Sequence, residues 1–534
     1  MMTSGAGAET MMTEKEKIKL ISRQIIERIV AGEITTMRKL DYEKRMQSKK
    51  YNLVRMLKNS EILFFARKAE KEKVRLLIKK PVRSISGISV VAVMAKPTPC
   101  PGKCIYCAQG ENSPKSYTGL EPAARRARMF DYDPYRQTEN RIRQLDAIGH
   151  SIEKIELIIM GGTFLSCDRD YQEWFAKRCF DALNGRDSLS LSEAQKVNET
   201  ARSRCVGLTI ETRPDYCRPK HIDWMLRLGA TRVELGVQTL SDEVYRKINR
   251  GHTVKDVVDV TRALKDSAFK VVYHMMPGLF QDDDEDIRMF DDLFSDSRFR
   301  PDMLKIYPVL VIEGTGLYDL YRRGEYRPLT NDTAKVLIAK MMQNVPPYVR
   351  IMRCQRDIPM EKIVAGPTAG NLREMAEDVL HKSGKECGCI RCHEAGHLFY
   401  KKGIIPGKVK INVLKYEASG GLEFFISLED KRQKVIVGFL RLRMPSSAAH
   451  RKEIDDKTAL IRELKVFGTA LDIGGNLSDS FQHKGRGKRL MYEAERIARD
   501  VGAIKVLVIS AIGTKEYYRK LGYVDDGPYL SKKI

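Results

Sequence analysis

The sequence lacks the features that mark a membrane-spanning, disulfide-built or disordered protein. No apolar run approaches the roughly 20 residues of a transmembrane helix, and the first residues lead into charge without the apolar region of a signal peptide. Eleven cysteines in 534 residues are too few for a disulfide scaffold. We find no internal repeat, and 43% hydrophobic residues exclude a wholly disordered chain. We expect a soluble, cytoplasmic protein of several domains.

Acidic residues are fewer than basic residues. The chain has 94 Lys and Arg against 70 Asp and Glu, a net charge of +24. Such an excess favours a polyanionic partner, because cations release counterions from phosphates. Residues 1–80 alone carry 20 basic and 10 acidic residues, and from Lys15 onward isoleucine and leucine recur at helical spacing. We predict a basic helical N-terminal arm that contacts RNA; the alternative is solvated lysines on small helices.

Residues 81–345 alternate β-rich runs with helical stretches, the pattern of parallel strands joined by right-handed crossovers. The candidate strands are Ile88–Met94, Ile155–Met160, Val206–Ile210, Arg232–Gly236, Lys270–Met275 and Met303–Tyr307. Six repeats predict an α/β fold, a partial (β/α)6 barrel of the TIM type. Functional residues of such a fold lie at the carboxyl ends of the strands.

The rest of the chain predicts a connector and a second α/β domain. Residues 346–408 are rich in Pro, Cys and His and form the connector. Residues 409–534 contain successive antiparallel strands, then a helix, a strand and a short helix. These elements are expected at Val409–Tyr416, Leu422–Leu428, Lys434–Arg443, Leu460–Phe467, Gly487–Val501, Ile504–Ile509 and Lys515–Leu521.

Cys100, Cys104 and Cys107 follow the first predicted strand with the spacing C-x3-C-x2-C. Three thiolates on one loop can hold three irons of a 4Fe–4S cluster and leave the fourth iron open. An open iron can bind S-adenosylmethionine (SAM), and electron transfer then releases a 5′-deoxyadenosyl radical. The alternatives are a three-Cys zinc site or unlinked buried thiols. The spacing and its position resemble the radical SAM superfamily.

Two further motifs close the second and third predicted strands. Gly161, Gly162 and Thr163 let the backbone approach the SAM amino group, although most Gly-Gly pairs are turns. Glu211 and Arg213 offer a carboxylate and a guanidinium for the SAM ribose and carboxylate. The alternative for that pair is a buried ion pair across the barrel mouth.

A second cysteine group, Cys387, Cys389 and Cys392, lies in the predicted connector between His381 and His397. Three sulfurs and one nitrogen can coordinate Zn²⁺ tetrahedrally. The spacing is too tight for a helix to supply every ligand, so we predict a structural zinc on a loop, with the fourth ligand open. The alternative is a set of reduced thiols.

A glycine-rich loop precedes the C-terminal helix. A Gln-x-x-Gly-x-Gly loop at a helix N-terminus points backbone N–H groups at a pyrophosphate. Its residues are Gln482, Lys484, Gly485, Arg486 and Gly487. The order of strand, loop, helix, strand and tyrosine pair resembles the GNAT acetyltransferases, which implies an acetyl-CoA site.

The GNAT resemblance assigns further residues to acetyl-CoA. In that family the strand before the loop binds pantetheine through its backbone, and an aromatic after the next strand contacts the thioester. The matching residues are Glu463, Leu464, Lys465, Val466 and Tyr517, with Tyr518 beside it. Glu463 is a candidate general base if its pKa is raised, although a Glu on a strand is more often structural.

A radical SAM half joined to a GNAT half resembles the family of catalytic subunits of the Elongator complex, in its compact archaeal or bacterial form. The likeness runs from about residue 15 to the C-terminus. The stretches that carry it are Met94–Pro97, Ser116–Gly119, Glu211–Cys217, Gly251–Val254, His274–Pro277, Leu304–Pro308, Gly370–Glu374 and Gly527–Tyr529.

This resemblance implies conversion of the tRNA wobble uridine to 5-carboxymethyluridine. In the implied route the adenosyl radical takes hydrogen from the acetyl methyl group, the carbon radical attacks uracil C5, and thioester hydrolysis releases CoA. The anticodon loop lets the base leave its stack at low cost. Lys154 matches a family position linked to acetyl-CoA and is expected to face the barrel mouth. Lys305, on the sixth predicted strand, is a catalytic candidate expected to point into the same cavity; both can equally be ion-paired or surface lysines. The resemblance is compatible with accessory subunits and with self-association, and the sequence does not choose between them.

Two rival functions remain at this point. One is a protein lysine acetyltransferase with a structural iron–sulfur domain, which the net charge of +24 disfavours because histone tails are basic. The other is a noncatalytic RNA-binding module, which two intact cofactor motifs disfavour.

Overall fold

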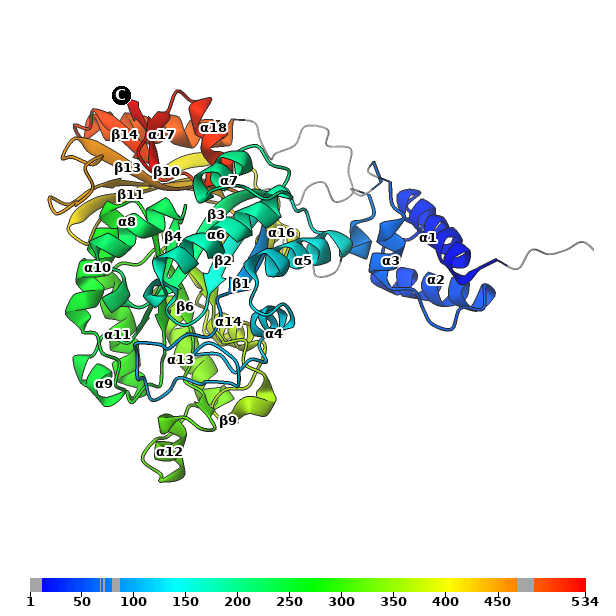
Figure 1. Ribbon diagram of the computed structural model, residues 1–534, viewed down its shortest axis with the longest axis horizontal. Helices are drawn as coiled ribbons and strands as arrows, with labels where there is room; N and C mark the ends of the chain where they lie inside the picture. Colours follow the sequence, from blue (N-terminus) through cyan, green and yellow to red (C-terminus); the bar gives the residue numbers. More distant parts are fainter. Residues whose placement is uncertain (1–11, 68, 71–72, 79–86, 468–484) are drawn as a thin grey trace, which may run out of the picture.

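The computed structural model describes residues 12–67, 69–70, 73–78, 87–467 and 485–534 (Figure 1). A helical arm comes first, a parallel half-barrel forms the centre, and a second sheet follows at the C-terminal end. The predicted loop residues Gln482 and Lys484 lie outside the described residues. None of the helices in the described ranges is long and apolar enough to span a membrane.

The central sheet has seven parallel strands in the order β1-β2-β3-β4-β5-β6-β8. They are β1 (Ser89–Met94), β2 (Lys154–Met160), β3 (Arg204–Thr212), β4 (Arg232–Gln238), β5 (Lys270–Met275), β6 (Met303–Ile306) and β8 (Arg350–Arg353). The predicted α/β partial barrel is confirmed, with one strand more than expected. The seventh strand lies in the range predicted as connector; it spans four residues and buries only Ile351, so its β pattern is weak.

Strands β2 to β6 separate an apolar outer face from an inner face that carries polar or charged residues. On β2, Ile155, Leu157 and Ile159 are fully buried in the main core, which also includes Phe175 of α6 (Arg169–Asn184). Burial of such side chains contributes roughly 1.5–3 kcal/mol each. Glu156, on the opposite face of β2, lines the interior of the half-barrel. The outer faces therefore hold the helices, while the inner faces carry charge.

Helices separate and follow the strands, and most begin at a capping residue. Thr253, for example, caps the helix Val254–Asp266 by accepting a hydrogen bond from the Asp256 N–H, while the Asp256 carboxylate accepts one from the Thr253 N–H. The remaining helices of this region are α4 (Pro122–Met129), α5 (Pro134–Ala147), α7 (Leu191–Asn198), α8 (Pro219–Arg227), α9 (Asp242–Lys247), α10 (Val254–Asp266), α11 (Asp283–Ser295), α12 (Gly316–Arg322), α13 (Asn331–Gln343) and α14 (Leu372–Lys382). A two-stranded sheet pairs β7 (Val311–Ile312) with β9 (Ile363–Ala365).

The C-terminal sheet has the order β10-β11-β12-β13-β14-β16-β15, with only the β13–β14 pair parallel. Its elements are β10 (Lys410–Ala418), β11 (Gly421–Asp430), β12 (Val435–Met444), β13 (Thr458–Val466), α17 (Arg486–Asp500), β14 (Lys505–Val508), α18 (Lys515–Arg519), β15 (Val524–Asp526) and β16 (Tyr529–Lys533). The predicted elements are present, whereas the short β15–β16 hairpin was not predicted, because β15 is charged and largely exposed. Phe425, Phe439 and Leu460 of this sheet share one hydrophobic core with the half-barrel.

The arm consists of α1 (Glu14–Val30), α2 (Met37–Lys50) and α3 (Asn59–Phe64), the helices that its periodicity predicts. Ile21, Ile25 and Ile62 are fully buried in its own small core. The arm projects from the side of the body in Figure 1 and meets it where α3 contacts α5. The cysteine-rich connector adds α15 (Ile390–His393) and α16 (Ala395–Lys402), the latter against β12.

Candidate active site

A cavity of about 1130 Å³ runs through the half-barrel and reaches the C-terminal sheet. One end is lined by Cys100 and Cys104, on the loop after β1, at the carboxyl ends of the parallel strands. The other end is lined by Glu463 and Lys465 of β13, next to Lys270, the first residue of β5. The C-terminal domain therefore closes the amino-terminal end of the half-barrel, and the two predicted cofactor sites open into one space.

The first cysteine group lies at the carboxyl end, as its position after β1 predicts. Cys104 and Cys107 interact with each other, and the Cys100 Sγ lies 3.7 Å from the Thr163 Oγ1. The three sulfurs are not among the described groups whose ligand atoms all lie within 4.8 Å of one another. They share one cavity wall, and three thiols on one loop suit the donor set of a three-Cys cluster.

Two buried arginines face this cysteine loop. Arg250 Nη1 lies 3.3 Å and Arg213 Nη1 3.8 Å from the Cys104 Sγ. The interaction with Cys107, opposed by burial and assisted by Arg250, lowers the pKa of the Cys104 thiol. The loop is thereby prepared to hold a thiolate, the form that binds iron.

The predicted SAM motifs line the same end. Gly161 has φ +130° and packs on Ala95, where a side chain would lie 3.1 Å from the Ala95 backbone nitrogen, so a glycine is needed. Gly162 and Thr163 line the cavity, as does Glu211. Arg213 forms an ion pair with Asp215 at 2.8 Å, a partner that the sequence interpretation did not name.

Halfway down the cavity Lys305 lies among acidic groups. It forms an ion pair with the fully buried Glu234 and lies 3.6 Å from the Glu211 Oε1. Burial would lower the pKa of Lys305, but Glu234, Tyr307 and Glu211 together outweigh burial and raise it above its usual range. His274 Nε2 lies 2.9 Å from the Glu234 Oε2, and Tyr117 donates a hydrogen bond of 2.8 Å to Glu211. Lys305 is therefore a fixed cation inside the barrel.

This cluster already pairs with a cation of the chain itself. Glu211, Glu234 and His274 have ligand atoms within 4.8 Å of one another, a spacing that suits a metal ion. The ammonium group of Lys305 already lies against both carboxylates. Its positive charge offsets one of the two carboxylates, and the Arg232 Nε lies 4.0 Å from the Glu234 Oε1, so a metal ion would meet two cations already present.

The amino-terminal end of the cavity is charged as well. Burial lowers the pKa of Lys270 to about 8, opposed by Glu463. Burial would raise the pKa of Glu463, but Arg441, whose Nε lies 2.9 Å from the Glu463 Oε2, together with Lys270 and Lys465 lowers it below its ordinary value. The condition for Glu463 as a general base, a raised pKa, is therefore not met. Lys154 begins β2 on the same strand face as Glu156, so it lies at this end and not at the barrel mouth.

Fully buried ion pairs fix β13 against the half-barrel. Asp302, just before β6, accepts hydrogen bonds of 2.8 and 2.5 Å from Arg462 of β13. Asp266, the last residue of α10, accepts one of 2.6 Å from Arg443 of β12. These contacts hold the backbone of β13 at the base of the cavity.

The predicted acetyl-CoA elements surround β13. Strand β13 pairs with β14 only over Thr458–Ile461, so within the described chain 463–466 has no strand partner on that side. Gly485 has φ +71° and precedes α17, whose N-terminus has no side-chain cap. A side chain at Gly487 would lie 2.5 Å from the Tyr517 hydroxyl. Free strand backbone beside an uncapped helix start suits a pantetheine and its pyrophosphate.

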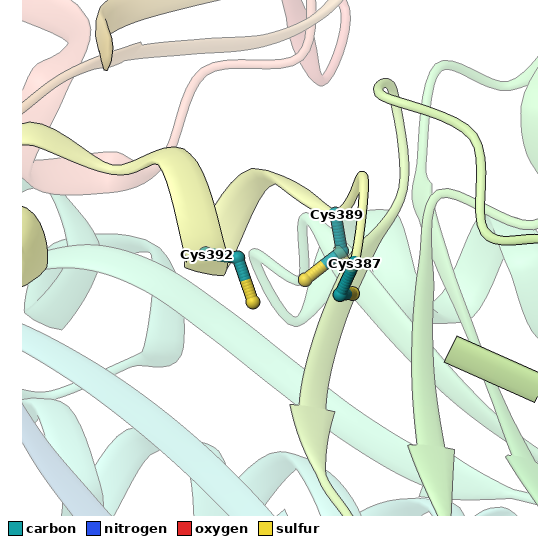
Figure 2. A group of neighbouring side chains, drawn as sticks. All are labelled: Cys387, Cys389 and Cys392. Atoms are coloured by element: carbon teal, nitrogen blue, oxygen red, sulfur yellow. The ribbon is translucent and has the colours of Figure 1, made fainter. Parts of the chain in front are cut away.

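Cys387, Cys389 and Cys392 lie together in and just before α15, which contacts β8 (Figure 2). Their three sulfurs lie within 4.8 Å of one another, and no histidine of the described residues joins the group at that distance. His381 and His397, the predicted alternatives for a fourth ligand, thus lie apart from it. Arg373 Nη2 lies 3.2 Å from the Cys392 Sγ. The sulfurs form a set that suits a thiophilic metal ion.

Comparisons with known proteins match the arm, the half-barrel and the C-terminal domain. Residues 18–85 match the ELP3 N-terminal domain, 98–294 the Radical SAM superfamily, 301–382 the Radical_SAM C-terminal domain and 412–523 the Acetyltransferase (GNAT) family. The tRNA uridine(34) acetyltransferase of Methanocaldococcus jannaschii is 51% identical over 538 residues, 97% of this chain and 99% of the relative. The chain belongs to the Elongator complex protein 3 family.

Two further members show how far the family likeness extends. Human Elongator complex protein 3 is 44% identical over 468 residues, 85% of this chain and 86% of the human protein. The solved structure of the Methanocaldococcus infernus Elp3 with an N-terminal deletion has a TM-score of 0.76 and 48% identity, covering 84% of this chain and all of that one. The Elp3-family chain is thus an enzyme with radical SAM and GNAT domains, which imply a 4Fe–4S cluster, SAM and acetyl-CoA.

Several residues of the site escaped the sequence interpretation. Arg250, Glu234, His274 and Lys270 all line the cavity, yet none was singled out. A signal was present for three of them, because Glu234 of β4 and Lys270 and His274 of β5 are charged or imidazole side chains at inward strand positions. Arg250 lies in the loop between α9 and α10, where the sequence carries no such signal. Such positions are costly to fill with charge unless the charge is paired or used.

Proposed function

We propose that this Elp3-family enzyme forms 5-carboxymethyluridine at the wobble uridine of tRNA, using SAM radical chemistry and the acetyl group of acetyl-CoA. One observation carries the proposal: the cysteine loop and the GNAT strand line one continuous cavity. Relatives named tRNA uridine(34) acetyltransferase, one of them 51% identical over nearly the whole chain, support tRNA as the substrate. The net charge of +24 agrees with an RNA partner.

In this proposal Cys100, Cys104 and Cys107 hold the 4Fe–4S cluster. Gly161, Gly162, Thr163, Glu211 and Arg213 hold SAM beside it. When bound, the pair supplies a radical that can take a hydrogen atom from an unactivated methyl group. Buried Arg250 stabilises the thiolate of Cys104 through its guanidinium.

The acetyl group enters from the opposite end. The free backbone of Glu463, Leu464, Lys465 and Val466 holds the pantetheine, with Gly485, Arg486 and Gly487 at the pyrophosphate and Lys154, Tyr517 and Tyr518 nearby. Lys305, kept protonated by Glu234, donates hydrogen bonds to a uracil carbonyl and holds the ring between the two cofactors. Ionised Glu463 acts as a charge partner of Arg441 in this scheme.

We also propose a structural zinc on Cys387, Cys389 and Cys392. The three neighbouring sulfurs support it, and the metal would stiffen the connector where the two domains meet. Accessory subunits, self-association and a cytoplasmic location are compatible proposals that rest on the family resemblance alone.

Nucleoside mass spectrometry tests the function. Anaerobically reconstituted enzyme is incubated with tRNA, SAM, acetyl-CoA and a reductant, and the digested RNA is searched for carboxymethylated uridine. We expect the product with the wild type and with Cys179→Ala, a core cysteine on α6, and none with Cys104→Ala. Product in Cys104→Ala would refute the radical role. Acetylated lysine peptides without any RNA product would favour the protein acetyltransferase instead.

A further inference from the structure

A second hollow, of about 500 Å³, opens on the surface between the α4–α5 connection and α6. Its walls are formed mainly by aromatic and basic side chains: Lys96, Phe130, Tyr132, Arg136, Tyr171 and Trp174. The hollow shares no lining residue with the main cavity, and the functions proposed above do not use it. Its composition suits a flat, electron-rich ligand attached to phosphate.

The aromatic rings leave a stacking face open. Trp174 is one of only two tryptophans in the chain, and 43% of it is exposed. Its ring lies 5.7 Å from that of Tyr171, tilted by 31°. An exposed tryptophan beside a second ring buries apolar surface only when a partner covers it.

Cations flank these rings. The Lys96 Nζ lies 4.8 Å from the centre of the Tyr171 ring, and the Arg136 guanidinium lies 5.3 Å from that of Phe130. Asp131 and Asp133 also line the hollow. Asp133 is engaged as the cap of α5, because it accepts a hydrogen bond of 2.8 Å from the Arg136 N–H. The exposed Asp131 carboxylate is an acceptor for the amino group of a base.

The hollow lies back to back with the active-site cavity. Tyr132 packs in a small apolar cluster with Met94 and Ala127, and Tyr117 and Met160 pack on the same cluster. Tyr117 and Met160 also line the main cavity. This cluster therefore contributes to both walls, so the hollow lies near the cavity that would receive a base.

We propose that this hollow binds an unstacked nucleobase of the RNA substrate, from a nucleotide next to the one whose base enters the cavity. The inference rests on the proposed function, because it takes tRNA as the substrate. Drawing one base out of a loop unstacks its neighbour, and an aromatic platform restores that lost stacking. Lys96 and Arg136 then face the adjoining phosphates.

Binding of an anticodon stem-loop hairpin to the reconstituted enzyme, without acetyl-CoA, tests this site. We expect Trp174→Ala to weaken binding about 10-fold, since truncating one stacking platform has an effect of this order. Trp174→Phe, which keeps a ring, should retain most of the affinity. Tyr492→Ala, which removes an aromatic that is 70% exposed on α17, serves as the matched control and should bind like the wild type.

Hairpins that lack one base on either side of the wobble uridine identify the ligand. For one of them, wild type and Trp174→Ala should bind equally, because the stacking base is gone. If Trp174→Ala binds the intact hairpin like the wild type, or loses the same factor on every hairpin, the base site is refuted and the proposed function is untouched. If the wild type binds no hairpin and forms no carboxymethylated uridine, both are refuted.

Discussion

Asp302 links the half-barrel to the C-terminal domain through a buried ion pair with Arg462, and its removal should destabilise the protein severely. Its side chain is fully buried, and it accepts hydrogen bonds from Arg462 and from the Val271 N–H at 2.8 Å. Burial would raise the pKa of Asp302, but Arg462, Lys265 and Arg441 hold it well below its usual range. Asp302→Ala removes the carboxylate that the buried guanidinium groups of Arg462 and Arg441 share. Breaking such a pair costs about 3–5 kcal/mol.

We expect a loss of stability at the lower end of that range, because Arg462 keeps a second carboxylate partner, Glu423, at 3.0 Å. A loss of about 3 kcal/mol changes the unfolding equilibrium by more than about 100-fold. Urea denaturation followed by circular dichroism measures it as a lower midpoint. Asp259→Ala is the matched control, because Asp259 is 40% exposed and pairs with the exposed Lys255; it should cost at most about 1 kcal/mol. Equal midpoints for the two variants would refute this account of the interface.

Two further predictions concern the cysteine group and a buried acid. Cys389→Ser removes one of three sulfurs within 4.8 Å, so elemental analysis should show loss of bound zinc, whereas Cys179→Ser keeps it; zinc retained in Cys389→Ser would contradict the site. Burial raises the pKa of Asp286 to about 8, opposed by the hydrogen bond from the Gly278 N–H. The folded carboxyl therefore holds its proton more tightly than the unfolded one, so stability falls as pH rises from about 4 to 8. Asp286→Asn should flatten that fall in urea midpoints at these pH values, and an unchanged fall would contradict it.

The fold was largely predictable because its signals are local. Runs such as 155–160 and 270–275 are β-rich and separated by helical stretches, so six parallel strands follow from the sequence alone. The seventh strand was missed because Arg350–Arg353 pairs with β6 through tertiary packing and has little strand character of its own.

The site was predictable where its residues are close in sequence and not where they meet through the fold. The spacing of Cys100, Cys104 and Cys107 alone indicates a cluster loop. Lys305 was singled out, yet its partner Glu234 lies 71 residues away. The sequence could not show that Arg441 lies opposite Glu463 and lowers its pKa, because that register is set by the pairing of β12 and β13.

Transfer of hydrogen from the acetyl methyl group is the most direct test of the claim that both cofactors act in one cavity. The enzyme is given tRNA, SAM, a reductant and acetyl-CoA deuterated on its methyl group, and the products are analysed by mass spectrometry. We expect one deuterium in 5′-deoxyadenosine and the remaining deuterium in carboxymethylated uridine. Unlabelled 5′-deoxyadenosine formed alongside that uridine product would contradict it.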